Sequence, residues 1–244
     1  MSVATPTGRP EASARARRPG TGMLVTLAAT GVFLVVAVLF GFTVVSSEDD
    51  VALNVEFDPV TFVDQNWEAI RAAISENAVP LADVLGRIQP DDSGKAAVED
   101  LTPVAEALGL ITTGEAHVYR VTATGTVIDA DTETSRGSIG LDVDGYDGPI
   151  AVRAYIGSRI PSDESSIRDS TGIIEFGDFR DQTEYGKVAS EINKRVLVGL
   201  EGLDVASLVG QPVTLTGAFT LRTFNQPAVD VSEIVLVPLS IEPA

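Results

Sequence analysis

The sequence contains no cysteine, one histidine and one tryptophan, and aromatic residues make up only 6% of its 244 residues. Without cysteine the chain can form no disulfide, carries no thiolate nucleophile and offers no zinc–cysteine site. A histidine-rich metal site is excluded because His117 is the single histidine. Basic residues are also scarce: 17 Lys and Arg stand against 35 Asp and Glu, a net charge of −18. Because affinity for phosphates comes mainly from Lys and Arg, we expect no nucleic-acid partner.

The charge is distributed unevenly along the chain. Residues 1–22 hold four arginines and one glutamate, and the rest of the chain holds 13 basic and 34 acidic residues, a balance of −21. Between these regions, residues 23–45 carry no charge. As a helix this segment would be about 35 Å long, enough to cross a hydrocarbon core of about 30 Å. We predict a disordered cytoplasmic tail over 1–22, a transmembrane helix over 23–45 and an acidic tether over 46–56.

The charge asymmetry predicts the orientation of this helix. Positively charged flanking segments usually remain in the cytoplasm, so we expect the N-terminus there. The helix would then anchor the chain in the cell membrane as a single-pass protein, with the C-terminal domain on the extracytoplasmic side. A cleaved signal peptide is the alternative. Its apolar region is usually shorter, and residues 43–46 make a poor cleavage site. We therefore expect an uncleaved signal-anchor.

Three helices are predicted over residues 57–110, which we interpret as a helical extension. Asp58 followed by Pro59 is typical of a helix start, and an apolar stripe runs from there toward Asn77. A short helix follows over 80–88. The third is predicted over 95–108, with Gly109 at its C-terminal end.

Residues 111–244 show a different pattern, dominated by alternation. Strands are predicted over 116–129, 138–143 and 150–156, then a helix over 185–200 with one further helical turn over 203–209. A strand region from Gly210 and a last strand over 229–237 complete the order. Gly125 inside the long first strand indicates a bulge or bend.

This order predicts an α+β fold. Three strands, a helix and two strands are the order of the OB-fold, a five-stranded β-barrel that binds oligonucleotides or oligosaccharides. The complete prediction is an OB-fold-like barrel over 111–244, with an N-terminal helical extension and one transmembrane helix ahead of it.

Several short blocks resemble the domain-of-unknown-function 2291 family of predicted bacterial periplasmic lipoproteins. The matching residues, in chain order, are Phe57-Asp58-Pro59, Phe62-Val63, Trp67, Ile156-Gly157, Ile167-Arg168-Asp169, Glu175-Phe176-Gly177-Asp178-Phe179, Gln182, Glu184-Tyr185, Val188-Ala189, Ile192-Asn193 and Gly217-Ala218-Phe219. The resemblance covers about 57–240. It implies a small periplasmic or surface protein, often associated with carbohydrate ABC-transport systems, and it implies no catalytic activity.

The chain departs from the family pattern at two places. It has no cysteine to carry a lipid, so the apolar segment is the expected means of attachment. Before Arg168, Ser165-Ser166 stands where the family usually has Gly-Thr.

Two regions offer candidate ligand sites. Asp142, Asp144 and Asp147 resemble part of a calcium loop, but their spacing breaks the EF-hand frame, and we favour a hairpin turn, which explains the same residues without a metal. The second region, 168–193, has a guanidinium suited to a carboxylate or polar ligand, together with side chains able to bind sugar hydroxyls. Tyr185 or Phe179 would supply a stacking face. The tentative ligand-binding residues are Arg168, Asp169, Asp178, Gln182, Tyr185 and Asn193.

The second region has an alternative interpretation as an internal network. Arg168 would then pair with Asp169 or Asp178 and hold the crossover loop to the helix. Both interpretations remain open at the level of sequence.

No catalytic motif is present. The chain has no G-x-S-x-G motif, P-loop or dinucleotide fingerprint. The sequence around His117 indicates neither a nucleophile nor an acid to orient the ring. We predict neither enzyme activity nor a metal or cofactor. Following the family resemblance, the expected function is that of a membrane-anchored extracytoplasmic accessory protein that contacts components of a carbohydrate ABC transporter. Direct binding of a carbohydrate or small ligand through 168–193 is the alternative.

Overall fold

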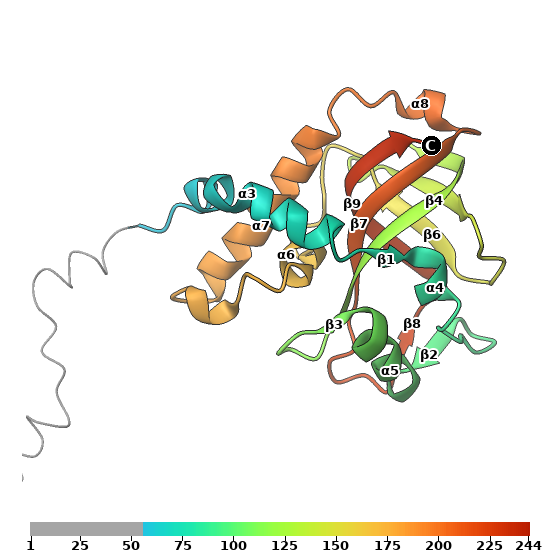
Figure 1. The fold of residues 1–244 in the computed structure, drawn as a ribbon, viewed down its shortest axis with the longest axis horizontal. Helices are drawn as coiled ribbons and strands as arrows, with labels where there is room; N and C mark the ends of the chain where they lie inside the picture. Colours follow the sequence, from blue (N-terminus) through green and yellow to red (C-terminus); the bar gives the residue numbers. More distant parts are fainter. Residues whose placement is uncertain (1–55) are drawn as a thin grey trace, which may run out of the picture. The chain divides into compact units, whose positions relative to one another are not determined.

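A computed structural model describes residues 56–244, and residues 57–244 form one compact unit. Its elements, in chain order, are α3 (Pro59–Ser75), β1 (Val79–Pro80), α4 (Leu81–Leu85), β2 (Lys95–Ala97), α5 (Val98–Leu108), β3 (Leu110–Ile111), β4 (His117–Asp131), β5 (Ser138–Val143), β6 (Ala151–Tyr155), α6 (Ser166–Ser170), the 3₁₀-helix η1 (Phe176–Asp178), α7 (Gln182–Gly199), α8 (Val205–Leu208), β7 (Pro212–Leu221), β8 (Ala228–Asp230) and β9 (Glu233–Pro243). Figure 1 shows their arrangement.

Five strands close into the barrel that the sequence predicts. The order is β4-β5-β6-β9-β7, and pairing of β4 with β7 closes the circle. β6 and β9 run parallel, and the other barrel pairs are antiparallel, so the sheet is mixed. The two-residue strands β1 and β3 add to β4, and β2 pairs with β8 as a separate small sheet. Helix α7 lies between the third and fourth barrel strands in chain order.

Strand β4 pairs with both halves of the barrel. Its first part pairs with β7 and its last part with β5, and Gly125 has a partner on each side, Val143 and Val213. A Cβ atom at Gly125 would overlap the backbone of Asp142, so only glycine permits this approach. The irregularity in register lies two residues further on, between Val127 and Asp129.

Two hydrophobic clusters stabilise the unit. The first fills the barrel interior, where Tyr119 and Phe219 stack at a centroid distance of 4.8 Å. The second lies outside the barrel and joins α3, α6 and α7 to β7 and β9 through residues such as Val63, Ile167 and Ala218. Figure 1 shows α3 and α7 side by side on this flank of the barrel.

Capping side chains define the starts of these two helices. Asp58 accepts a hydrogen bond from Val60 N at 3.0 Å, and Pro59 is the first helical residue, as the sequence predicts. Asp181 accepts from Thr183 N and Glu184 N at the start of α7. The predicted start of this helix at Tyr185 was therefore three residues late.

Two predicted elements are wrong in their extent. Residues 95–97 belong to strand β2 rather than to the third helix, because they pair with β8. The single strand predicted over 229–237 is two strands, β8 and β9, which lie in different sheets. Asp230 accepts hydrogen bonds from Ser232 N and Oγ, and this turn redirects the chain between the sheets.

The predicted fold class needs a correction in its membrane part. Among residues 56–244, no helix is both long and apolar enough to cross a membrane. The described fold is therefore a barrel domain with flanking helices, without the transmembrane helix, and the single-pass signal-anchor assignment finds no support in it. The segment 23–45 on which that prediction fell lies outside the described residues, as do the tail and residues 46–55 of the tether. The division between 57–110 and 111–244 stays a prediction.

His117 lies at the start of β4 and is 2% exposed. Its Nδ1 atom is buried without a hydrogen-bond partner. Burial lowers the pKa of His117, because a protonated ring would bring a charge and a second N–H donor into this setting.

We predict that the sole histidine makes the domain less stable in mild acid. Its pKa is lowered by folding, so the unfolded chain takes up a proton below about pH 6.5 that the folded chain resists. The free energy of unfolding should fall between pH 6.5 and 5 with a slope of at most about 1.4 kcal/mol per pH unit. Urea unfolding monitored by fluorescence of the single tryptophan, Trp67, measures it. The variant His117→Leu should lose this slope, and an unchanged slope would contradict the assignment.

Candidate functional site

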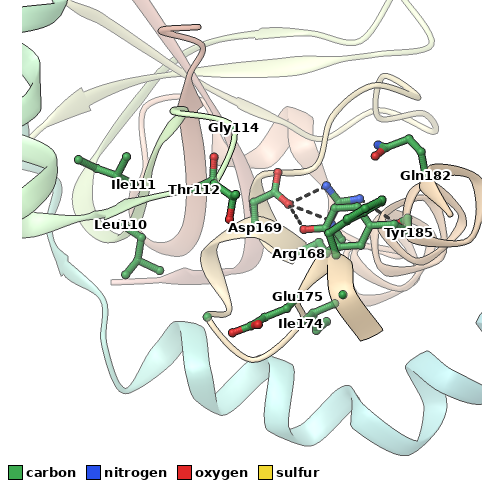
Figure 2. A pocket seen from close by; sticks show the side chains of 14 residues that line it. Leu110, Ile111, Thr112, Gly114, Arg168, Asp169, Ile174, Glu175, Gln182 and Tyr185 are labelled. Atoms are coloured by element: carbon green, nitrogen blue, oxygen red, sulfur yellow. Dashed lines mark hydrogen bonds and ion pairs between the residues drawn. The ribbon is translucent and has the colours of Figure 1, made fainter. Parts of the chain in front are cut away.

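A partly open cleft of about 780 Å³ lies where α6, η1 and the first turns of α7 meet the β3–β4 connection. Its lining residues are Leu110, Ile111, Thr112, Thr113, Gly114, Arg168, Asp169, Gly172, Ile174, Glu175, Phe176, Gly177, Gln182 and Tyr185. In Figure 2 the side chains of 110–112 lie on one side of the cleft, and Tyr185 and Gln182 lie on the other.

Local turn chemistry shapes the segment between α6 and α7. Gly172 adopts a φ of 69°, which allows the chain to turn sharply after α6. Glu175 and Asp178 then cap each other reciprocally around η1, with Glu175 N donating to Asp178 Oδ2 at 3.0 Å. These turns place Glu175 and Phe176 at the cleft and lead the chain into α7.

Arg168, Asp169 and Tyr185 form the polar centre of the cleft. The Arg168 guanidinium contacts Asp169 Oδ1 through Nη2 at 2.6 Å and Nε at 2.8 Å, and its Nη1 donates to the backbone oxygen of Tyr185 at 2.8 Å. Its Cζ atom also lies over the Tyr185 ring, 3.4 Å from the centroid. The Tyr185 hydroxyl donates to Asp169 Oδ1 at 3.2 Å. Figure 2 shows the guanidinium enclosed between these two residues.

The environment of this centre keeps Tyr185 protonated. Burial, and secondly the nearby Asp169 carboxylate, raise the pKa of Tyr185. The phenol therefore remains a hydrogen-bond donor to Asp169, whose other oxygen accepts from Ser165 Oγ at 2.6 Å. All three nitrogens of Arg168 and both oxygens of Asp169 thus have partners within the protein, and these contacts tie α6 to α7.

An aromatic cluster packs against Tyr185. Phe57, Phe62 and Phe179 contact one another at centroid distances of 5.4 to 5.8 Å. Phe179 and Phe176 both contact the Tyr185 ring, at 5.5 and 5.6 Å. Because the guanidinium also lies over the ring, Tyr185 has little open face on which a ligand could stack. Phe179 is 9% exposed, so it offers no stacking face either. Phe176, 51% exposed, is the aromatic side chain available at the cleft.

The structure brings together four of the six predicted site residues. Arg168, Asp169, Gln182 and Tyr185 line the cleft, whereas Asp178 and Asn193 do not. Asp178 caps η1.

Asn193 lies further along α7 and is buried. Its side-chain nitrogen donates to Glu164 O at 2.8 Å, and its Oδ1 is buried without a partner. It therefore lies among the residues that hold the crossover segment to α7 rather than at the cleft.

One wall of the cleft was missed by the sequence reasoning. Residues 110–114 belong to strand β3 and the connection to β4, and β3 pairs with β4 at Leu110↔Val118 and Ile111↔His117. They carry no motif, and their only local signal is the small polar run Thr112-Thr113-Gly114 ahead of a strand. Glu175 and Phe176 belong to a short apolar run and to the family resemblance, but the sequence did not indicate them as site residues.

The acidic segment 142–147 spans the end of β5 and the start of the hairpin connection to β6. Gly145 adopts a φ of 83°, and Tyr146 N donates to Val143 O at 3.1 Å, as expected of a tight turn. Within residues 56–244, no group of three or more acidic or histidine side chains is arranged to hold a metal ion. The turn interpretation accounts for this segment.

Comparison with protein families identifies the chain. A family described as a predicted periplasmic lipoprotein, DUF2291, matches residues 32–242, and the chain belongs to this family. The family description agrees with an extracytoplasmic, membrane-associated location. None of the 244 residues is a cysteine, so none can carry a thioether-linked lipid. No curated protein matches the sequence significantly.

A solved structure supports the fold. An OB-fold protein from Thermotoga maritima is similar to this chain with a TM-score of 0.56 and 18% identity, covering 78% of this chain and 99% of its own. At this identity the likeness concerns the fold alone. It agrees with the five-stranded barrel described above.

Many residues that carry the family resemblance lie in the second hydrophobic cluster. They are Phe57, Phe62, Val63, Trp67, Ile167, Phe179, Tyr185, Val188, Ile192 and Ala218. The resemblance therefore reports mainly the packing of α3, α6 and α7 against the barrel, and only secondarily the cleft.

We predict that Arg168→Ala destabilises the protein by about 3–5 kcal/mol, because it leaves the Asp169 carboxylate without its cation. The two side chains are only 7% and 14% exposed. Arg222→Ala is the matched control: Arg222 pairs with Asp163 at 2.8 Å, but both side chains are more than half exposed, so its loss should cost at most about 1 kcal/mol. Urea unfolding measures both.

The double variant Arg168→Met/Asp169→Leu distinguishes the cost of an unpaired buried charge from the cost of lost side-chain packing. It removes both charges, so it should recover much of the stability lost in Arg168→Ala. Equal losses for Arg168→Ala and Arg222→Ala would contradict the view that the buried pair holds α6 to α7.

Proposed function

We propose that the protein is an extracytoplasmic carbohydrate-binding protein that takes its ligand in the cleft between the β3–β4 connection, α6 and α7. The observation that carries this proposal is the cleft itself, a concave site of suitable size with mixed polar and apolar walls. Sugars present hydroxyl groups at their edges and C–H groups on their faces. Gln182 and Glu175 offer amide and carboxylate groups for the hydroxyls, and Phe176 offers a ring for the C–H face.

Direct binding to a saccharide panel tests this proposal. The full-length protein, purified in a detergent that carries no sugar, should bind at least one mono- or oligosaccharide. Phe176→Ala should weaken that binding by about tenfold, which corresponds to about 1.4 kcal/mol. Phe224→Ala is the matched control, because Phe224 is 60% exposed but does not line the cleft. Absence of binding across the panel, or equal effects of the two variants, would refute the proposal.

A second candidate function is favoured by a separate observation. Three large apolar side chains at or beside the cleft mouth, Ile111, Ile173 and Phe176, are 41 to 51% exposed. Neighbouring exposed apolar side chains are a feature of protein-binding surfaces. We propose that this surface docks on a component of a carbohydrate ABC transporter, which is the accessory role expected from the family resemblance.

Ile173 separates the two candidate functions, because it is exposed beside the cleft but does not line it. Ile173→Asp should abolish co-purification of transporter subunits from native membranes and leave saccharide binding unchanged. Ile128→Asp is the control, since Ile128 is 59% exposed on β4 and does not line the cleft. Mass spectrometry identifies the recovered proteins. If no transporter subunit is recovered with the unmodified protein, the stable-complex form of this proposal is wrong.

A further inference from the structure

The charge of the cleft comes from three side chains, Arg168, Asp169 and Glu175. Arg168 is the single cation among the lining residues, and its charge is compensated by the Asp169 carboxylate at 2.6 Å. Its three nitrogens already have acceptors in Asp169 and the Tyr185 backbone. These contacts engage one N–H of each nitrogen, and the side chain is only 7% exposed, so a ligand carboxylate, phosphate or sulfate has little access to the guanidinium.

Glu175 is therefore the uncompensated charge of the cleft. Its side chain is exposed, and it accepts a hydrogen bond from the backbone within its own capping box rather than from a cation. The lining residues carry a net charge of −1, and residues 56–244 hold 13 basic and 31 acidic residues, a balance of −18. Both the local and the long-range field thus repel anions.

The groups that remain available for a ligand are neutral or negative. Gln182 lines the cleft as an exposed side chain, and Phe176 keeps about half of its surface open. Glu175 can accept hydroxyl hydrogen bonds through its carboxylate. The arrangement provides three exposed polar side chains, Glu175, Gln182 and Thr113, and one apolar ring, and Arg168 is the single cation among the lining residues.

We propose that the ligand is an uncharged sugar and that Glu175 excludes its anionic counterparts. This inference rests on the proposed function, since it specifies the class of carbohydrate bound in the same cleft. Glu175 and Gln182 bind hydroxyl groups, and Phe176 contacts the apolar face of the ring. Arg168, which the sequence presented as the leading ligand-binding residue, holds α6 to α7 and does not bind the ligand.

Matched pairs of probes test the inference. The full-length protein is titrated with glucose, galactose, mannose and ribose, and with glucuronate, galacturonate, mannuronate and ribose 5-phosphate. For every sugar that binds, the uncharged member should bind at least about tenfold more tightly than the anionic one. This ratio should decrease at high ionic strength, because salt screens the repulsion from an exposed carboxylate.

Glu175→Gln tests the residue responsible, and Asp178→Asn is its control. Both side chains are exposed members of the same capping box, but only Glu175 lines the cleft. Glu175→Gln should reduce the preference for the uncharged sugar severalfold, whereas Asp178→Asn should leave it unchanged.

The outcomes distinguish this inference from the proposed function. Tighter binding of an anionic sugar than of its uncharged parent would overturn the inference while supporting carbohydrate binding. Equal effects of the two variants would overturn the role of Glu175. Absence of binding by all eight probes and by the wider saccharide panel would refute the proposed function itself.

Discussion

The pairing of strand β4 with both β5 and β7 is the constraint on which the domain depends. One strand can serve both halves of the barrel only if its neighbours approach it closely on either side, and Gly125 permits this where the two pairings overlap. Closure leaves β7 and β9 with an outer flank that must be covered, and α3, α6 and α7 cover it. The cleft lies where this covering layer meets the β3–β4 connection, so its position follows from the closure of the barrel.

Within the covering layer, the Arg168 contacts decide which polar groups a ligand can reach. A guanidinium that lies on Tyr185 and pairs with Asp169 stabilises the junction of α6 and α7, and each of its three nitrogens then already has a partner within the protein. A buried ion pair of this kind requires both partners, since removal of either leaves an uncompensated charge. The same contacts that fix the shape of the cleft therefore leave Glu175, Phe176 and Gln182 as exposed side chains of its lining, and the function we propose assigns recognition to them.

Family membership and packing are closely related in this chain. The aromatic and aliphatic residues shared with the family form the layer between α3, α6, α7 and the barrel. Four of the six site residues proposed from sequence line the cleft because α6 and the start of α7 are adjacent through this layer. Asp178 and Asn193 were grouped with them by proximity in sequence, but Asp178 caps η1, and Asn193 lies further along α7 against Glu164.

The sequence by itself determined the succession of barrel strands along the chain, the helix between the third and fourth of them and the start of α3. Periodicity and capping are local properties, so a short stretch of sequence is enough to indicate them. It was less accurate where a segment changes partners, as at residues 95–97 and at Asp230, since strand pairing depends on residues far away in the chain. Only the tertiary structure decided that residues 110–114 face α6 and α7, and that Arg168 is buried and paired with Asp169. These contacts join segments separated by many residues, and no local pattern records which hydrogen-bond donors are already occupied.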